Sequence, residues 1–471
     1  MQNNDGTQTE THKTLSPLKE QEKKVIEQIA RKVGTPVYVY FADRMETAVE
    51  ELPKKINGED EPKLKYCYAM LANSNPYLVQ KIASLITSKS GPGKGGVLAA
   101  SVIDLNLLRR IHPLPEALNL VYADSALSEE GIDACKALLE QGLVSHVYLI
   151  LQNEQQCDRF ADWYKKNHGG DSWGGKLSVG LRVKVAKGKP HAHTAYSGKY
   201  SRFGIPQEAL KGKVEEIRGL RVPQIGFHIY PGTNLLDISA VKEIYNKFLE
   251  TVCGVANETD KPVFLDLGGG FGIDYKDRKV VSMEQVICTL RQLICGDQQG
   301  GNQLKINEIL LEPGRLIIGP SAVLVSRVVD VVGTDPKFVY MDTGYSHFAR
   351  PYIYRELDER VWHHKVEFIS DRNVKEKAFL VGATMASGDF LAGNPKKKAR
   401  VHVPEGIKRG DLVCIMDVGA YGYCMSSNFS GLLRPPEVLV EKEEGYKWCV
   451  IRQRETFESF IGEVPSCLNW H

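Results

Sequence analysis

Apolar and polar positions along the chain divide it into two regions of different texture. From Leu64 onward, short apolar runs alternate with longer amphipathic stretches such as Ser128–Gln141 and Leu236–Glu250. The apolar runs predict eight strands, at Leu64–Met70, Gly96–Val102, Leu118–Ala123, Val144–Leu151, Leu177–Val183, Ile225–Tyr230, Val263–Leu267 and Ile309–Leu311. Eight strands separated by helices imply a parallel sheet closed into a barrel. The span Leu64–Gly319 fits the usual size of such a barrel, about 250 residues.

After Pro320 the pattern changes to strand-rich segments with few helical stretches. These segments predict a second, mostly β region, with strands at Val323–Val332, Lys337–Met341, Lys365–Ile369, Ala378–Val381, Val401–Val403, Asp411–Asp417 and Val438–Val440.

The chain before the barrel is predicted from three short patterns. Residues 1–15 are polar, which predicts a disordered tail. Ser16–Val33 carries an apolar stripe and predicts a helix, with Ser16 as its cap and Pro17 in its first turn. Thr35–Tyr40 then predicts a strand.

Charge and cysteine usage exclude several classes of protein. The 471 residues contain 60 Lys plus Arg against 58 Asp plus Glu, whereas a binder of nucleic acid or anionic membrane normally has a basic excess. The ten cysteines show no CxxC or zinc-finger spacing, which indicates free thiols in a reducing compartment. The start is polar, and no apolar run approaches the roughly 18 to 20 residues that cross a bilayer. We therefore expect a soluble, cytoplasmic protein with no nucleic-acid or membrane partner.

Two local features suggest additional sites but have simpler explanations. The basic run Asn394–Arg400 is more typical of a solvated loop than of a targeting patch. The pair His363-His364 and the segment His191–His193 have no supporting carboxylate at ligand spacing. We therefore expect no metal site.

Two motifs follow the last strands of the predicted barrel, where barrel active sites and phosphate sites form. Gly268, Gly269 and Gly270 directly follow the seventh strand. Three glycines let backbone N–H groups approach a phosphate closely, although a tight turn alone would also explain them. Glu312, in the motif Glu312–Arg315, follows the eighth strand. A carboxylate there can bond a protonated pyridine nitrogen, although a surface ion pair is the simpler alternative. Their adjacent positions favour the functional interpretation.

Four motifs together resemble the pyridoxal-phosphate decarboxylases built on an alanine-racemase-like barrel (fold type III), namely the diaminopimelate and ornithine/arginine decarboxylases. The motifs are Tyr68–Asn73, Asp266–Gly272, Leu311–Arg315 and Gly419–Tyr423. The resemblance covers roughly residues 35–440 and implies an α/β fold, a (β/α)8 TIM barrel plus a C-terminal mostly β domain. It also implies that the early strand near Val37 joins the β domain. We therefore place the barrel domain at residues 47–319 and the β domain at residues 16–46 and 320–471.

The resemblance implies cofactor contacts for several side chains. The counterpart of Tyr421 contacts the cofactor phosphate, Glu312 matches the partner of the pyridine nitrogen, and Arg315 lies in the same site. Thr233 falls where a serine usually meets the phosphate. Tyr230 falls where a histidine stacks on the pyridine ring, so stacking is conceivable whereas protonation chemistry is not.

The substrate contacts and the assembly are implied in the same way. Arg350 and Tyr354 match a stretch that binds substrate in the diaminopimelate branch. The segment Lys199–Gly204 matches a Ser-Lys-Phe-Gly segment of the family. Because the family builds its sites across a head-to-tail dimer, the resemblance implies a homodimer and a small amino-acid-like ligand.

The chain departs from the family at the residues that carry the reaction. Leu71 stands where the family has the lysine that carries the cofactor as a Schiff base, and Leu98 replaces an acidic residue that supports the ring. Met385 replaces the cysteine that donates a proton in the partner's site, and Ala386 replaces the acid that recognises the far amine of the substrate. Each change is toward an apolar side chain.

Another lysine is a poor substitute for the missing one. Lys65 shares the strand parity of Leu71, but six residues at about 3.3 Å each place it roughly 20 Å away. Lys199 precedes a loop at the active face and is the better of the two.

We favour a homologue with a degenerate site, a pseudoenzyme that cannot decarboxylate by the family mechanism. Such a protein would bind a ligand or regulate a partner, with pyridoxal phosphate bound non-covalently or absent. One alternative is an enzyme of altered, possibly cofactor-independent chemistry on an amino-acid-like substrate. A second is an active decarboxylase in which the lysine was replaced deliberately, and the other losses count against it.

Overall fold

The computed structural model describes residues 12–56, 62–91, 93–167, 173–185, 201–220, 222–256, 263–295, 305–354, 363–393 and 399–462. Lys199, His191–His193 and most of the basic run Asn394–Arg400 lie outside the described residues. The chain divides into two compact units. The first comprises residues 1–13, 47–273 and 279–316, and the second comprises residues 14–46, 274–278 and 317–471.

Eight parallel strands of the first unit close into a barrel, as the sequence predicts. They are β3 (Lys63–Ala69), β4 (Gly95–Ala99), β5 (Asn119–Tyr122), β6 (His146–Leu151), β7 (Leu177–Arg182), β8 (Gln224–His228), β9 (Val263–Asp266) and β12 (Ile306–Leu311). Closure is made by β12, which pairs with β3 on one side and with β9 on the other. The (β/α)8 prediction is therefore confirmed.

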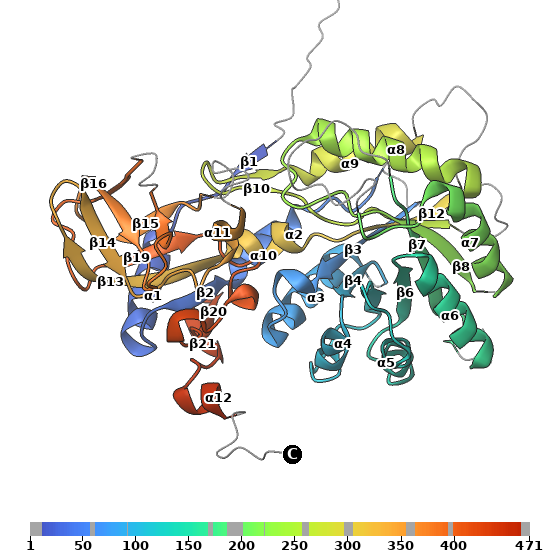
Figure 1. Ribbon diagram of the computed structural model, residues 1–471, viewed down its shortest axis with the longest axis horizontal. Helices are drawn as coiled ribbons and strands as arrows, with labels where there is room; N and C mark the ends of the chain where they lie inside the picture. The colour runs from blue at the N-terminus through green and yellow to red at the C-terminus, as the bar shows by residue number, and fades with distance from the viewer. Residues whose placement is uncertain are drawn as a thin grey trace, which may run out of the picture. The chain divides into compact units, whose positions relative to one another are not determined.

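Helices follow the strands and lie on the outside of the barrel (Figure 1). They are α3 (Pro76–Ser90), α4 (Val102–Leu108), α5 (Glu129–Glu140), α6 (Glu154–Lys166), α7 (Gln207–Gly219), α8 (Ile238–Ala256) and α9 (Met283–Cys295), with the short η1 (Met70–Ala72) after β3. Polar caps set several of the starts. The Ser128 side chain accepts from the Gly131 N–H and begins α5, close to the start that the sequence predicts.

The middle of the barrel is filled by apolar side chains around Phe264. Cys67, Leu98, Val121, Tyr148, Ile150 and Leu310, from five further strands, pack with Phe264 in one buried cluster. Two glycines on the neighbouring strands β8 and β7 leave the space for its ring. A Cβ on Gly226 would lie 2.3 Å from the ring, and one on Gly180 would lie 3.0 Å from it. The side chain of Phe264 therefore closes the centre of the barrel.

The second unit contains a ten-stranded sheet in which strands distant in sequence are neighbours. Its strands are β2 (Val37–Phe41), β13 (Ala322–Val332), β14 (Lys337–Met341), β15 (Val366–Ile369), β16 (Val374–Val381), β17 (Phe390–Ala392), β18 (Val401–Pro404), β19 (Leu412–Met416), β20 (Glu437–Lys442) and β21 (Tyr446–Arg452). The strand β2 pairs with β13 and β20. The predicted return of the early strand to the β region is therefore confirmed.

The remaining elements are the helix α1, which packs on the sheet of the second unit through Val25, Ile26 and Ile29, and a set of shorter segments. They are α1 (Glu20–Lys32), α2 (Ala42–Glu50), α10 (Gly314–Ile318), α11 (Arg350–Tyr354), α12 (Phe457–Ile461), η3 (Gly319–Ser321), η5 (Tyr423–Met425), η6 (Phe429–Gly431), β1 (His12–Thr14), β10 (Ile273–Asp274) and β11 (Lys279–Val281).

Two predictions about the start of the chain are wrong. The first helix begins at Glu20 rather than after Ser16, because the Glu22 carboxylate accepts from the Lys19 N–H and so satisfies a backbone donor at that start. Residues 12–14 form β1, which pairs with β11, so the predicted disordered tail does not extend over them. Tertiary pairing supplies the hydrogen bonds that their polar composition gave no reason to expect.

Within the described residues, no helix is long and apolar enough to cross a membrane. The cysteines that the structure describes are free thiols, in agreement with the prediction, and four of them are buried (Cys67, Cys135, Cys157 and Cys414).

Adding a methyl group at Gly226 tests the packing around Phe264. Gly226→Ala is expected to lower the free energy of unfolding by about 1–3 kcal/mol, because an overpacked core must shift its side chains. Gly212→Ala is the matched control, since Gly212 lies inside α7 with nothing within 4 Å of the added carbon. The control is expected to stabilise by up to about 1 kcal/mol. Urea denaturation measures both, and equal effects would contradict the packing argument.

Candidate active site

A buried group of ionisable side chains lies at the carboxyl ends of the barrel strands. His228 ends β8, Asp266 ends β9, and Glu312 directly follows β12. All three are at most 6% exposed. Each of them offers one ligand atom within 4.8 Å of those of the other two, and His228 Nε2 lies 3.8 Å from Glu312 Oε1. Strand register therefore brings together residues that are far apart in sequence.

The two carboxyl groups share a tendency to hold a proton. Burial raises the pKa of Asp266 to about 7. The hydrogen bond that its Oδ1 accepts from the Gly268 N–H, at 3.0 Å, offsets this rise only in part. Burial also raises the pKa of Glu312, and the neighbouring Asp266 charge raises it further. Two adjacent buried carboxylates cannot both ionise cheaply, so the pair holds one proton near neutral pH.

Arg182 and His228 complete the electrostatics of the group. Burial lowers the pKa of Arg182 to about 10, although the Glu312 carboxylate acts in the opposite direction. The guanidinium Nη1 donates to Gln152 Oε1 at 2.7 Å and lies over the ring of Phe203, 4.6 Å from its centre. Burial lowers the pKa of His228 as well, and the Arg182 charge adds to this, so the imidazole is neutral.

Several buried polar atoms of this group have no hydrogen-bond partner among the described residues. They are His228 Nδ1, Asp266 Oδ2 and Glu312 Oε1. Buried polar atoms are nearly always paired, so such a set marks a place where a ligand supplies the missing partner. The carboxylate oxygens can accept from an N–H group of a ligand or bind a divalent cation.

The glycine loop lies beside the acids and offers free donors. A Cβ on Gly269 would lie 2.3 Å from the Glu312 carbonyl oxygen, and one on Gly270 would lie 1.9 Å from the Gly232 carbonyl oxygen. Only glycine allows so close an approach between these loops. Within the described residues, no hydrogen bond engages the N–H group of Gly269 or Gly270.

The loops after β8 and β12 meet through Arg315 and Thr233, two of the residues that the sequence assigns to the site. Arg315 Nη2 donates to Thr233 Oγ1 at 3.1 Å, and both side chains are buried. Tyr230 lies in the loop after β8, where the Arg182 guanidinium is 5.8 Å from its ring centre. The structure thus brings Thr233, Gly268–Gly270, Glu312 and Arg315 together at one end of the barrel.

The positions where the sequence predicts departures from the family pattern lie in different surroundings. Leu71, in η1 just beyond β3, is 49% exposed at the same end of the barrel. Leu98 is buried in the apolar cluster around Phe264. Lys65 points into the barrel but pairs with Glu308 Oε1 at 2.8 Å and donates to the Tyr148 hydroxyl. It is therefore committed to another interaction.

The remaining candidate residues belong to the second unit. The Arg350 guanidinium lies 4.0 Å from the centre of the Tyr421 ring, which is a cation–π contact. Met385 is 94% exposed in the loop after β16, beside Ala386. Tyr354 ends α11, but its side chain lies outside the described residues.

Sequence reasoning assigned no role to His228, Asp266 or Arg182. Each is the last inward-facing residue of its strand, the position where barrel enzymes place catalytic groups. Strand parity was the available signal. The histidine pair that the sequence did consider is structural in part, since His364 Nδ1 hydrogen-bonds the Met416 carbonyl and its ring stacks on Tyr275.

Comparisons with known proteins agree on one relationship. Residues 42–319 match the model of the pyridoxal-dependent decarboxylase family, pyridoxal binding domain. The diaminopimelate decarboxylase of Archaeoglobus fulgidus is 28% identical over 440 residues, which cover 93% of this chain and 94% of the relative. That of Neisseria meningitidis serogroup A is 29% identical over 448 residues, which cover 93% of this chain and 97% of the relative.

Solved structures show the same fold. The diaminopimelate decarboxylase from M. jannaschii in co-complex with L-lysine superposes with a TM-score of 0.75 at 22% identity, covering 93% of this chain and 94% of that chain. The enzyme from Helicobacter pylori complexed with L-lysine has a TM-score of 0.71 at 21% identity, covering 93% of this chain and 98% of that chain. The alanine-racemase-like fold expected from the motifs is therefore confirmed.

The shared proton predicts how stability depends on pH. The folded chain keeps a proton that the unfolded chain releases, since the pKa of Asp266 rises from its ordinary value near 4 to about 7. This contribution is therefore complete below pH 4 and is lost as the pH rises toward 7. Asp266→Asn cannot ionise and still accepts from the Gly268 N–H. It is expected to gain about 1–3 kcal/mol relative to the parent between pH 5 and pH 8.

Urea denaturation across that pH range measures the difference between the two proteins. Asp162→Asn, at an exposed position of α6, is the matched control and should leave the pH dependence unchanged. Parallel curves for the parent and Asp266→Asn would show that no proton is held by the acid pair.

Proposed function

Because the chain belongs to the pyridoxal-dependent decarboxylase family, we propose that it is a ligand-binding or regulatory homologue with a degenerate site. It binds pyridoxal phosphate without a covalent bond and does not decarboxylate amino acids by the family mechanism. The observation that carries this proposal is Leu71, the hydrocarbon side chain at the end of β3 where the family has its lysine. When bound, the cofactor supplies an electron-withdrawing ring that stabilises negative charge on an attached carbon.

The loss of the anchor is not compensated by Lys65. Covalent catalysis of this kind begins with an amine nucleophile, and the leucine side chain has none. Lys65 is held by Glu308 and Tyr148 inside the barrel, toward the amino ends of the strands. Leu98 places a further apolar side chain at a position that is acidic in the family, and it packs in the core rather than facing a ligand.

The ring end of the proposed site retains its chemistry. The Asp266–Glu312 pair holds one proton in a hydrogen bond between the two carboxyl groups, and their remaining lone pairs can accept an N–H group. Glu312 is the residue we assign to the ring nitrogen, with Asp266 and His228 holding its carboxyl group in place. The neutral His228 adds no positive charge that would repel a protonated ring.

The phosphate end retains donors rather than acceptors. The N–H groups of Gly269 and Gly270 are free of partners among the described residues, and an anion is the natural acceptor for them. Arg315 and Thr233 lie next to this loop, joined to each other by a hydrogen bond. These groups support binding of a phosphate without a covalent anchor. Tyr230 is placed to pack against the ring.

The second unit supplies the proposed contacts to an amino-acid-like ligand and to a second copy of the chain. Arg350, oriented by the ring of Tyr421, suits a carboxylate, and Tyr354 is assigned to the same ligand from the family pattern. Three exposed apolar side chains of this unit, Ile353, Met385 and Phe429, are consistent with a homodimer interface.

An enzyme with altered chemistry is the second candidate, and one observation favours it. Asp266 has a pKa near 7 and is paired with a second acid, the arrangement that acid–base enzymes use. In that case the protein would turn over an amino-acid-like substrate, and Glu312→Gln would abolish the turnover.

Titration with pyridoxal phosphate tests the principal proposal. Saturable binding is expected, with no stoichiometric adduct on the barrel after borohydride reduction and intact-mass analysis. Glu312→Gln is expected to weaken binding about tenfold or more, because a charge-assisted hydrogen bond is replaced by a weaker one. Glu284→Gln, on α9, is the matched control. A stable adduct on one lysine of the parent protein would contradict non-covalent binding and favour the altered enzyme.

Restoring the lysine separates degeneration from a single replaced residue. Leu71→Lys is expected to form one borohydride-reducible adduct at position 71 with pyridoxal phosphate. It is not expected to release carbon dioxide from diaminopimelate, lysine or ornithine, because Tyr230, Leu98, Met385 and Ala386 still lack the family chemistry. Leu71→Met, which keeps the volume but adds no amine, is the control. Recovery of decarboxylation would mean that the rest of the site is intact.

A further inference from the structure

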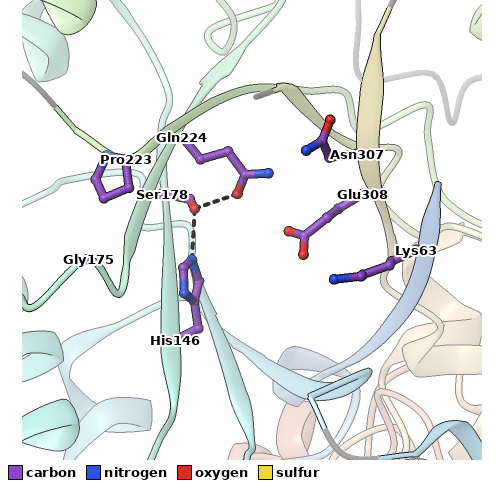
Figure 2. Close-up of a pocket in the computed structure, with 8 residues that line it drawn as sticks. All are labelled: Lys63, His146, Gly175, Ser178, Pro223, Gln224, Asn307 and Glu308. Atoms are coloured by element: carbon purple, nitrogen blue, oxygen red, sulfur yellow. Dashed lines mark hydrogen bonds between the residues drawn. The ribbon is translucent and has the colours of Figure 1, made fainter. Parts of the chain in front are cut away.

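A hollow lies at the amino ends of the barrel strands, at the end opposite to the Asp266–Glu312 pair (Figure 2). Its volume is about 240 Å³. Six of the eight residues that line it carry polar side chains, namely Lys63, His146, Ser178, Gln224, Asn307 and Glu308, and the other two are Gly175 and Pro223. The apolar cluster around Phe264 separates it from the acid pair at the other end. It is therefore distinct from the site described above.

The carboxylate of Glu308 is already neutralised by its neighbours. Lys65 Nζ lies 2.8 Å from Oε1, and the Tyr148 hydroxyl donates to Oε2 at 2.6 Å. Burial acts to raise the pKa of Glu308, but the Lys65 charge and these hydrogen bonds lower it below its ordinary value. A buried ion pair of this kind leaves no net charge for a ligand to balance.

A hydrogen-bond chain along one wall fixes the orientation of Gln224. The Ser178 hydroxyl donates to Gln224 Oε1 at 2.7 Å, and His146 Nε2 lies 2.8 Å from the same hydroxyl oxygen. Because the hydroxyl proton is used, the imidazole donates to it through Nε2. Burial and the Lys65 charge lower the pKa of His146 to about 4, so the ring is neutral. The amide oxygen of Gln224 is thereby occupied, and its NH₂ group is left for the hollow.

Lys63 adds a positive charge that no described residue balances. Figure 2 shows its ammonium group and the Gln224 amide nitrogen both pointing into the hollow, with Asn307 at its rim. With Glu308 paired to Lys65 and His146 neutral, Lys63 leaves an excess of one positive charge. The unpaired groups are therefore a cation and amide N–H donors.

We propose that this hollow binds a small anion, a carboxylate or a phosphate, through Lys63 and the Gln224 amide. Asn307 adds a further polar contact. The volume equals that of about eight water molecules at about 30 Å³ each, so the ligand is an inorganic ion or an organic acid of similar size. Lys63 is exposed at the mouth of the hollow, and the oriented Gln224 NH₂ group points into it, so a small anion can meet both.

Calorimetric titration of the full-length protein at low ionic strength, with inorganic phosphate and separately with succinate, tests the proposal. Saturable binding of one of them is expected, and the tighter ligand identifies the chemistry as phosphate or carboxylate. Lys63→Met and Gln224→Leu are each expected to weaken it about tenfold or more, the usual loss for a charge-assisted or buried hydrogen bond. Lys166→Met, exposed on α6, is the matched control and should bind as the parent does.

Anion binding at the glycine loop is distinguished by Arg315→Met. If phosphate binding is lost in Arg315→Met but retained in Lys63→Met, the glycine loop at the other end of the barrel binds the phosphate, and the proposal is overturned. Equal binding by Lys63→Met, Lys166→Met and the parent, or no saturable binding, also overturns it. Pyridoxal phosphate binding should be unaffected by Lys63→Met. The small-anion proposal and the proposed function can therefore be contradicted separately.

Discussion

The barrel depends on how its centre is filled. Phe264 occupies the middle of the interior because Gly180 and Gly226 carry no Cβ, and its ring meets Tyr148 edge to face, 5.0 Å between centres. This apolar layer completes the core and keeps the polar groups of the two ends apart. The polar groups of each end therefore interact with others of the same end, as Lys65 does with Glu308.

The acid pair and the glycine loop have different relations to the missing lysine. Asp266, Glu312 and His228 depend on one another and on strand register, so they persist as a buried group whatever occupies position 71. Leu71 lies beyond the end of β3, and about half of its side chain is exposed to solvent. A change there costs the fold little, and under the proposed function it removes the covalent step. Recognition of ring and phosphate can thus survive the loss of the reaction.

The hollow at the amino ends of the strands also combines a neutralised buried group with one unpaired charge, which here is positive. Lys65 and Glu308 neutralise each other inside the barrel, and Lys63, two residues earlier on β3, faces the opening. The two lysines have the same strand parity, yet one is a structural partner and the other is free to meet a ligand. Burial and the availability of a carboxylate decide between these roles.

Much of the fold could be predicted from the sequence because it rests on local periodicity. The eight apolar runs became the eight barrel strands, and the early strand returned to the second sheet as β2. Glu312 and the glycines Gly268–Gly270 were found because they follow strands directly. The predicted start of the first helix was wrong by a few residues, since the helix begins at Glu20, where the Glu22 carboxylate accepts from the Lys19 N–H.

What the sequence determined by itself was therefore the order of elements, the barrel and the family motifs with their apolar departures. Only the tertiary structure joined His228, Asp266 and Arg182 to Glu312, because barrel closure and register, not sequence distance, set which strand ends face one another. It also decided that Lys65 is paired and that Lys63 and Gln224 face a hollow. Burial and pairing are properties of the closed barrel, and no single strand carries them.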